Sequence, residues 1–325
     1  MALSSCKTAM AIIAMLLLLL IPLGIIGNNP SDNFISEDVS IRNDTITLYG
    51  TLLKPTHVKN PPIILFISGS GPTDRNGNQF GMVNNSIKLL AEELAIRGVA
   101  SVRYDKRGVG QSICNQEEID VVFDNFADDA AAWLKMLNNN PNFSRVFVAG
   151  HSEGSLVGML AINQISTDGF ISIAGAGKRI DRIILEQISS LPDSLLNESK
   201  SILDSLLIGR TVNNVPMQLF GLFRPSVQPY MISWLRYDPT EVLSKINIPQ
   251  LIVQGTTDIQ VPVENAKLLA VSNENANLEI IEGMNHVLKM AEADRMENIA
   301  TYRNPSLPVS NKLVETIAKF VKSHE

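Results

Sequence analysis

Residues 146–155 read VFVAGHSEGS and place Ser152 between Gly150 and Gly154, directly after a run of apolar letters. The apolar run predicts a buried strand, and the spacing that follows predicts a helix over residues 152–163. Gly-x-Ser-x-Gly between a strand and a helix is typical of a nucleophile elbow, a tight and strained turn whose flanking residues must be small. Because the N-terminus of a helix favours developing negative charge, we expect Ser152 to be a nucleophile.

A serine hydroxyl is a poor nucleophile at neutral pH, so it needs a base within hydrogen-bond reach and a third group that orients that base. The chain has four histidines. His151 adjoins the serine and its side chain must leave the turn in another direction, whereas His57 lies in a loop before the first buried strand. His324 is on a tail that we expect to fray. His286, in the loop after the last predicted strand, is therefore the expected base.

The orienting acid is expected after a strand that lies between the serine and the histidine in the sequence. The strand at residues 250–254 leads into a loop that bears Asp258, whereas the strand at residues 170–174 is followed by Gly-Ala-Gly and offers no acid. Glu282 is the second candidate, but it belongs to the same loop as His286. We therefore predict that Asp258 orients the base.

The rest of the chain alternates apolar runs with helical patterns after an N-terminal hairpin at residues 38–53. This alternation predicts an α/β fold, with a mostly parallel sheet and helices on both faces. The strands after the hairpin are expected at residues 62–68, 99–104, 145–149, 170–174, 250–254 and 278–281, and the helices at residues 87–97, 123–137, 152–163, 263–270 and 312–322.

One segment, residues 177–247, has helical stretches and several prolines but no convincing strand. We interpret it as a helical cap inserted into the sheet domain; a small second domain without a role in binding is the alternative. Tyr230, Met231 and Trp234 are candidate substrate-binding residues of this cap, or equally residues of its own core. The expected divisions are a leader at residues 1–27, a first part of the core at 28–176, the cap at 177–247 and a second part of the core at 248–325.

The leader has one cation, Lys7, followed by the uncharged residues 9–26. Pro22 and Gly24 shorten the apolar helical core to a length that favours a signal peptide, with cleavage after Gly27. An uncleaved membrane anchor, which needs about 20 apolar residues, is the alternative. Both interpretations place the rest of the chain outside the cytoplasm, as a secreted or periplasmic protein or one anchored by its N-terminal segment.

Composition excludes several classes of partner and cofactor. The 325 residues are 45% hydrophobic and 18% charged, with a net charge of −6 and no basic block, so a nucleic acid partner is not expected. The histidines are scattered and neither cysteine belongs to a C-x-x-C pattern, so no metal site is expected. A membrane is expected as a partner only through the N-terminal segment, if that segment is not cleaved.

Two further motifs and the order of the candidate residues connect the chain with a known superfamily. Residues 103–112, RYDKRGVGQS, are similar to the D-x-R-G-x-G-x-S turn of many α/β hydrolases, and the order Ser, Asp, His is the order of that superfamily. The resemblance covers nearly all of the chain from residue 38 to the last helix. Residues 68–77, SGSGPTDRNG, and residues 223–234 resemble the EstD-type bacterial carboxylesterases, which are serine aminopeptidase-like hydrolases. The chain departs from many members at Ser68, where they have a histidine.

This resemblance implies the α/β-hydrolase fold, a helical cap and the hydrolysis of a small-molecule ester without a cofactor. An oxyanion hole needs two backbone N–H donors, one from the residue after the nucleophile and one from the loop after the first buried strand. Glu153 supplies the first, and Ser70 matches the position that supplies the second. The same residues fit a serine aminopeptidase, an acyl thioesterase or an acyltransferase. A catalytically dead binding protein is the alternative that is not an enzyme.

Overall fold

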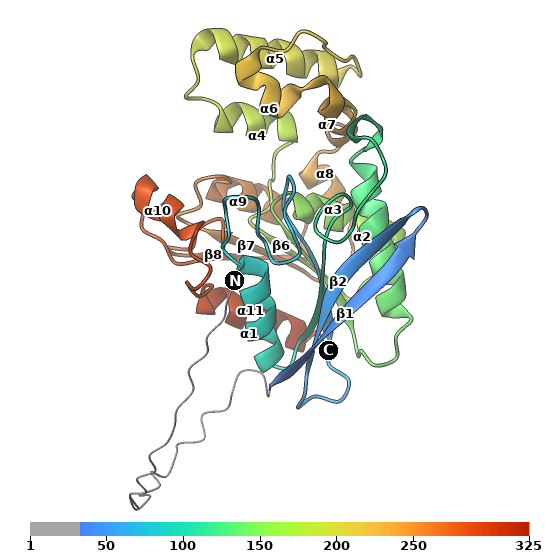
Figure 1. Ribbon diagram of the computed structural model, residues 1–325. Coiled ribbons are helices and arrows are strands. Elements are labelled where there is room, and N and C mark those ends of the chain that lie inside the picture. Colours follow the sequence, from blue (N-terminus) through green and yellow to red (C-terminus); the bar gives the residue numbers. More distant parts are fainter. Residues whose placement is uncertain (1–32, 325) are drawn as a thin grey trace, which may run out of the picture.

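The computed structural model describes residues 33–324 and contains an eight-stranded sheet in the order β1-β2-β4-β3-β5-β6-β7-β8 (Figure 1). β1 and β2 form an antiparallel hairpin, β2 is antiparallel to β4, and the remaining neighbours are parallel. The predicted mostly parallel sheet is thus confirmed, while the predicted leader at residues 1–27 lies outside the described residues. The strands are β1 (Phe34–Asn43), β2 (Ile46–Pro55), β3 (Ile63–Ile67), β4 (Ala100–Tyr104), β5 (Val146–His151), β6 (Gly169–Ile173), β7 (Gln250–Gly255) and β8 (Ala276–Ile281).

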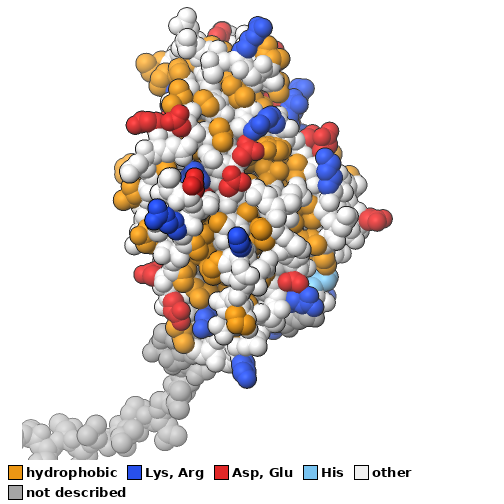
Figure 2. Space-filling view, turned by 90° about the vertical axis from the view of Figure 1, so that its right-hand side faces the viewer, with side chains coloured by type: hydrophobic (Ala, Val, Ile, Leu, Met, Phe, Trp, Pro, Cys, Tyr) orange, Lys and Arg blue, Asp and Glu red, His pale blue; other side chains and the backbone are white. Residues whose placement is uncertain are grey.

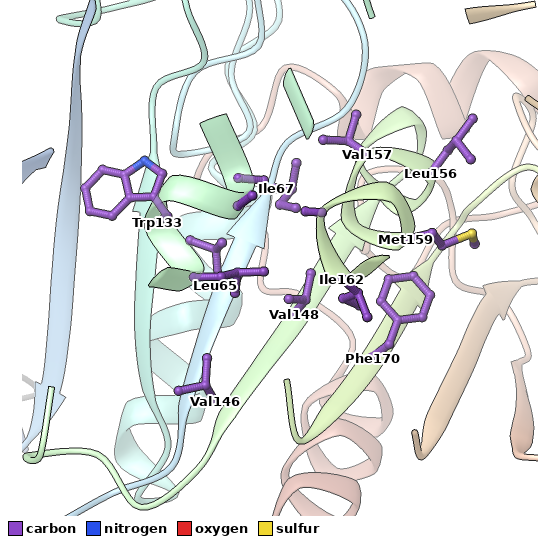
Figure 3. Close-up of a cluster of buried hydrophobic side chains, with 14 of the residues drawn as sticks. Leu65, Ile67, Trp133, Val146, Val148, Leu156, Val157, Met159, Ile162 and Phe170 are labelled. Carbon is purple, nitrogen blue, oxygen red and sulfur yellow. The ribbon is translucent and has the colours of Figure 1, made fainter. Parts of the chain in front are cut away.

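The central strands are buried on both faces, which explains their continuous apolar sequences. All five residues of β3 are buried, and successive side chains enter opposite layers. Leu65 packs with α2 and α3 on one face, whereas Ile64 and Phe66 pack with α1 and α11 on the other. Figure 3 shows the first of these layers, in which Leu65 lies between Trp133 and Val148. The helices that cover the sheet include α1 (Ser86–Ile96), α2 (Asp124–Asn138), α3 (Glu153–Gln164), α9 (Val263–Val271) and α11 (Asn311–Ser323).

Between β6 and β7 the structure has helices and no strand, and most of this segment lies beyond one end of the sheet (Figure 1). The segment has its own apolar cluster, which includes Leu203, Leu206, Phe223 and Met231. We call this helical segment the cap. It contains α4 (Ile180–Gln187), α5 (Asp193–Leu207), η3 (Met217–Leu219), α6 (Phe220–Phe223), η4 (Pro225–Val227), α7 (Gln228–Trp234) and α8 (Pro239–Leu243).

The end of α7 and the residues after it contact the start of α2. The Trp234 ring stacks on Phe123, with ring centroids 5.0 Å apart and an interplanar angle of 6°. The Phe123 backbone N–H donates to Ser233 Oγ at 2.7 Å, and Arg236 forms an ion pair with Asp124 at 2.5 Å. Aromatic stacking and hydrogen bonds at this junction connect the cap with the sheet domain.

One helix, α10 (Arg295–Thr301), was not predicted from the sequence. It begins at Asp294, whose carboxylate accepts from the backbone N–H groups of Met296 and Glu297. Met296 and Ile299 are exposed, so the helix buries no apolar stripe that periodicity would detect. Among residues 33–324, no helix is long and apolar enough to span a membrane.

Candidate active site

Ser152 occupies a strained turn between β5 and α3. Its backbone has φ 55° and ψ −121°, a region that costs a non-glycine residue roughly 1–3 kcal/mol. The flanking glycines are required by space: a Cβ on Gly150 would lie 2.1 Å from the Gly154 carbonyl oxygen, and a Cβ on Gly154 would lie 2.3 Å from the Ile67 carbonyl oxygen. The predicted elbow geometry is therefore present, with the strand before it and the helix after it.

His286 and Asp258 are joined directly. His286 Nδ1 lies 2.8 Å from Asp258 Oδ2, and the side chains are 6% and 0% exposed. A carboxylate at Nδ1 directs the proton of the neutral imidazole to that nitrogen and leaves Nε2 as the acceptor. The pair thus has the arrangement of a base and its orienting acid.

Asp258 is held as an anion although it is buried. Oδ1 accepts the backbone N–H groups of Gln260 at 2.8 Å and Val261 at 2.9 Å, and Oδ2 also accepts from Gln254 Nε2 at 2.9 Å. Burial raises the pKa of Asp258, but the interaction with His286 and the hydrogen bonds outweigh it, so the pKa lies below its ordinary value. Glu282, the second candidate acid, is exposed to solvent.

Ser152 and His286 line the same pocket, which has a volume of about 220 Å³. Among the hydrogen bonds of residues 33–324, none joins Ser152 to His286. The remaining wall comes mainly from the loop after β3 and from the C-terminal part of the core. The lining residues are Gly69, Ser70, Thr73, Gly77, Gln79, Met82, Asn84, Ser86, His151, Ser152, Gln260, His286, Val287 and Tyr302.

His151 is packed against His286, a contact that sequence reasoning missed. Its Nε2 donates to the His286 carbonyl oxygen at 2.8 Å, and the two ring centroids are 4.8 Å apart. Burial, together with the nearby His286, lowers the pKa of His151 to about 3, so the ring is neutral at neutral pH. The position of His151 next to Ser152 predicts that its side chain turns away from the serine. The sequence does not predict that this side chain turns toward His286.

The two expected oxyanion donors come from the loop after β3 and from the start of α3. Ser70 lines the pocket, and a Cβ on the preceding Gly69 would lie 3.2 Å from the Ser152 Cβ. Glu153 is the first residue of α3, so its backbone N–H has no acceptor within the helix. Both positions are compatible with N–H groups directed at an oxygen bound near Ser152.

Lys106 is a buried cation that contacts both the loop after β3 and the start of α3, and sequence reasoning assigned it no role. Lys106 Nζ donates to the Gly69 carbonyl oxygen, lies 3.6 Å from Glu153 Oε1 and sits 5.6 Å from the centre of the Phe126 ring. Glu153 Oε2 accepts from the Tyr230 hydroxyl at 2.7 Å. Burial lowers the pKa of Lys106, and the nearby Glu153 opposes that effect.

The three candidate cap residues do not line the pocket that contains Ser152. Tyr230 is hydrogen-bonded to Glu153, Met231 is buried in the apolar cluster of the cap, and Trp234 stacks on Phe123. Each thus has a packing partner that accounts for its position. A role for them in substrate binding stays a prediction.

The loop after β3 is braced by the side chains of Asp74 and Arg75. Arg75 is buried and pairs with Asp105 at 2.7 Å. One oxygen of the Asp74 carboxylate accepts the backbone N–H groups of Asn76 and Asn78. This network connects the pocket wall with the loop after β4.

An eight-stranded, mostly parallel sheet, an elbow serine after β5 and an Asp–His pair from the loops after β7 and β8 together have the arrangement of the α/β-hydrolase fold. The chain has the α/β-hydrolase fold, and the solved structures compared below agree with this. The sequence model of the family described as "Serine aminopeptidase, S33" matches residues 80–217, which include the elbow and end before Asp258.

Among curated proteins, the chain is similar to esterase EstD of Thermotoga maritima, with 24% identity over 268 residues. That match covers 80% of this chain and 62% of the relative, so the chain spans less than two thirds of the relative's length.

Two solved structures share the fold. Est1E from Butyrivibrio proteoclasticus with bound ferulic acid has a TM-score of 0.60 and 20% identity, covering 88% of this chain and 96% of that one. Esterase Pf2001 from Pyrococcus furiosus has a TM-score of 0.57 and 17% identity, covering 93% and 97%.

Proposed function

We propose that this protein is a serine hydrolase that cleaves carboxylic esters of small molecules. The observation that carries the proposal is the pocket shared by Ser152 and His286, with Asp258 bonded to the far side of the imidazole. The names of the relatives support the choice of substrate, because EstD and Pf2001 are esterases and the Est1E structure holds ferulic acid. The proposed reaction requires no cofactor.

In this mechanism His286 Nε2 takes the proton of Ser152 Oγ as that oxygen bonds to the acyl carbon. The N–H groups of Ser70 and Glu153 stabilise the oxyanion of the tetrahedral intermediate. The intermediate collapses to an acyl-enzyme as His286 gives its proton to the departing alcohol. Water then attacks, His286 takes its proton, and the second collapse releases the acid and restores the Ser152 hydroxyl. Asp258 stabilises the imidazolium throughout but is not itself protonated.

The aminopeptidase alternative is favoured by the description of the matching family. A free α-amine, however, needs a carboxylate near the nucleophile, and none of the pocket-lining residues in the described part of the chain is acidic. The nearby Glu153 carboxylate is already shared between Lys106 and Tyr230. The pocket therefore supports an ester more strongly than an N-terminal peptide.

The test of this proposal is the Ser152→Ala variant, assayed on a short p-nitrophenyl ester, an acyl-CoA and an aminoacyl amide. We expect the wild type to prefer the ester and the variant to lose at least about 99% of turnover. A fluorophosphonate should label wild-type Ser152 alone. Ser155→Ala is the matched control, because the Ser155 hydroxyl lies in the same helical turn but bonds to Ser172 at 2.7 Å.

Two results would contradict this proposal. A folded wild type that neither turns over the ester nor reacts with the fluorophosphonate would support a binding protein with a dead hydrolase fold. Preferential turnover of the acyl-CoA would instead support a thioesterase or an acyltransferase, which use the same three residues.

The proposed partner is the ester substrate, with no nucleic acid partner. Figure 2 supports the latter point, because acidic and basic side chains are interspersed on the face it shows. The proposed location, outside the cytoplasm, rests on the sequence of residues 1–27, and so does contact with a membrane if that segment is retained.

A further inference from the structure

One peptide unit connects the buried lysine with the pocket. The Gly69 carbonyl and the Ser70 N–H belong to the same planar unit, and within residues 33–324 every peptide bond is trans. In a trans peptide the C=O and N–H bonds point in opposite directions. Since Lys106 Nζ binds the Gly69 oxygen, the Ser70 N–H is directed away from Lys106, and Ser70 lines the pocket.

The lysine can act on this peptide in two ways. A charge-assisted hydrogen bond fixes the rotation of the peptide plane, which glycine at position 69 would otherwise leave free. The positive charge also polarises the peptide, and hydrogen bonds in a chain strengthen one another, so the N–H becomes a better donor. Both effects act in a buried setting, since the Lys106 side chain is only 3% exposed.

The second oxyanion donor is tied to the same cation. Glu153 provides the other backbone N–H, and its side chain, also 3% exposed, lies 3.6 Å from Lys106. One ion pair therefore underlies both donors and connects the loop after β3 with the start of α3. The Tyr230 hydroxyl completes the network from the cap by donating to Glu153.

We propose that Lys106 is a positioning residue that orients the oxyanion hole through the Gly69–Ser70 peptide, with Glu153 holding the lysine in place. This inference rests on the proposed ester hydrolysis. Stability alone is a weak reason for such a group, because replacing a buried ion pair by apolar residues of similar volume is often neutral or stabilising. The hydrogen bond from Lys106 to the Gly69 carbonyl gives the ion pair a further effect, because it orients the Ser70 N–H in the pocket.

The experiment compares Lys106→Met and the double variant Lys106→Met/Glu153→Gln with the wild type. The double variant removes both charges, so no unpaired charge is left buried if the single variant fails to fold. Three quantities are measured: kcat and KM on a p-nitrophenyl ester, and the affinity for a trifluoromethyl ketone, whose adduct with Ser152 carries an oxyanion.

We expect kcat and the ketone affinity to fall together by roughly 10- to 100-fold, less than the 10²–10³ that follows deletion of an oxyanion donor. KM should change less than about threefold, because the lysine acts on the transition state rather than on the bound ester.

The matched controls are Arg107→Met and Arg107→Met/Asp129→Asn. Arg107 is the next residue and also pairs with a buried carboxylate, with two hydrogen bonds of 2.7 and 2.8 Å to Asp129. It is not part of the wall of the Ser152 pocket. We expect these controls to lose stability but to keep kcat and ketone affinity.

Several results would overturn this inference while leaving the proposed function standing: unchanged kcat in folded Lys106 variants, an effect confined to KM, or equal losses in the Arg107 variants. Failure of both Lys106 variants to fold beside folded controls would assign Lys106 a purely structural role. A wild type without esterase activity or fluorophosphonate labelling would instead overturn the proposed function, and this inference with it.

Discussion

The carboxylate of Asp258 is bonded on both oxygens, and this fixes the direction from which it meets His286. Asp258→Asn keeps the shape of the side chain but removes the charge and favours the wrong tautomer of the histidine. In a serine protease with the same three residues, this change lowers kcat by about 10⁴. We expect a loss of roughly 10²–10⁴ in kcat on one activated ester, with folding checked by circular dichroism.

Glu282→Gln is the matched control for that measurement. Glu282 is exposed, so its charge is screened by solvent. Its replacement should change kcat less than about tenfold, or roughly 1.4 kcal/mol of barrier. A large loss of kcat in Glu282→Gln together with an unchanged kcat in Asp258→Asn would show that the acid was wrongly assigned. The assignments of Ser152 and His286 would not be affected by that result.

At the scale of single residues, the sequence predicted the groups whose chemistry depends on a motif or on chain order. Ser152, Asp258 and His286 each follow a recognisable strand, so elimination among a few candidates is enough to name a candidate triad, whose roles stay predictions. Lys106 and His151 were missed as partners because their roles depend on where a long side chain or a ring turns after the backbone is placed. The spacing of residues in the sequence does not predict where such a side chain points.

At the scale of elements, strands and helices of the core were predicted within a few residues because their apolar patterns are long and regular. The short helices of the cap and α10 gave weaker signals. The four residues of α6 and the seven of α10 are too few to show a period. These helices depend on contacts with other parts of the chain, which a local pattern does not contain.

The junction between α7 and α2 can be tested with Trp234→Ala. Trp234 is half-buried and stacked on Phe123, so we expect the free energy of unfolding to fall by about 2 kcal/mol, below the roughly 3–5 kcal/mol of a fully buried aromatic. Because Trp234 does not line the Ser152 pocket, kcat and KM on a short ester should stay within about threefold.

Phe220→Ala is the control for that variant, since Phe220 is an aromatic residue of the cap that is 43% exposed. Its removal should change the free energy of unfolding by less than about 0.5 kcal/mol in urea titrations. A tenfold rise in KM for Trp234→Ala at unchanged stability would instead assign the tryptophan to substrate binding.

At the scale of the whole molecule, the site forms where loops from several parallel strands meet. Gly69 follows β3, Ser152 follows β5, Asp258 follows β7 and His286 follows β8. Carboxyl ends of parallel strands lie at one edge of a sheet, so residues distant in sequence converge there. This convergence explains why the fold class and the candidate triad were predictable together, whereas the pocket wall was not.

At the same scale, we predict that residues 1–27 direct the rest of the chain outside the cytoplasm. Lys7 followed by the uncharged residues 9–26 has the charge pattern of a signal peptide or of an anchor. Leu18→Arg places a charge in the centre of the apolar run, where insertion costs roughly 2.5–3.5 kcal/mol. We expect this variant to accumulate in the cytoplasm, as measured by fractionation of the native host.

Ser4→Arg adds the same charge before the apolar run, where positive charge belongs in an export signal, so this control should be exported like the wild type. N-terminal sequencing of the exported wild type then separates the two interpretations of the leader. A mature chain that begins at Asn28 indicates cleavage after Gly27, whereas an intact Met1 in the membrane fraction indicates an anchor. A soluble cytoplasmic pool of full-length wild type, equal to that of Leu18→Arg, would contradict both, because the apolar run would then have no effect on location.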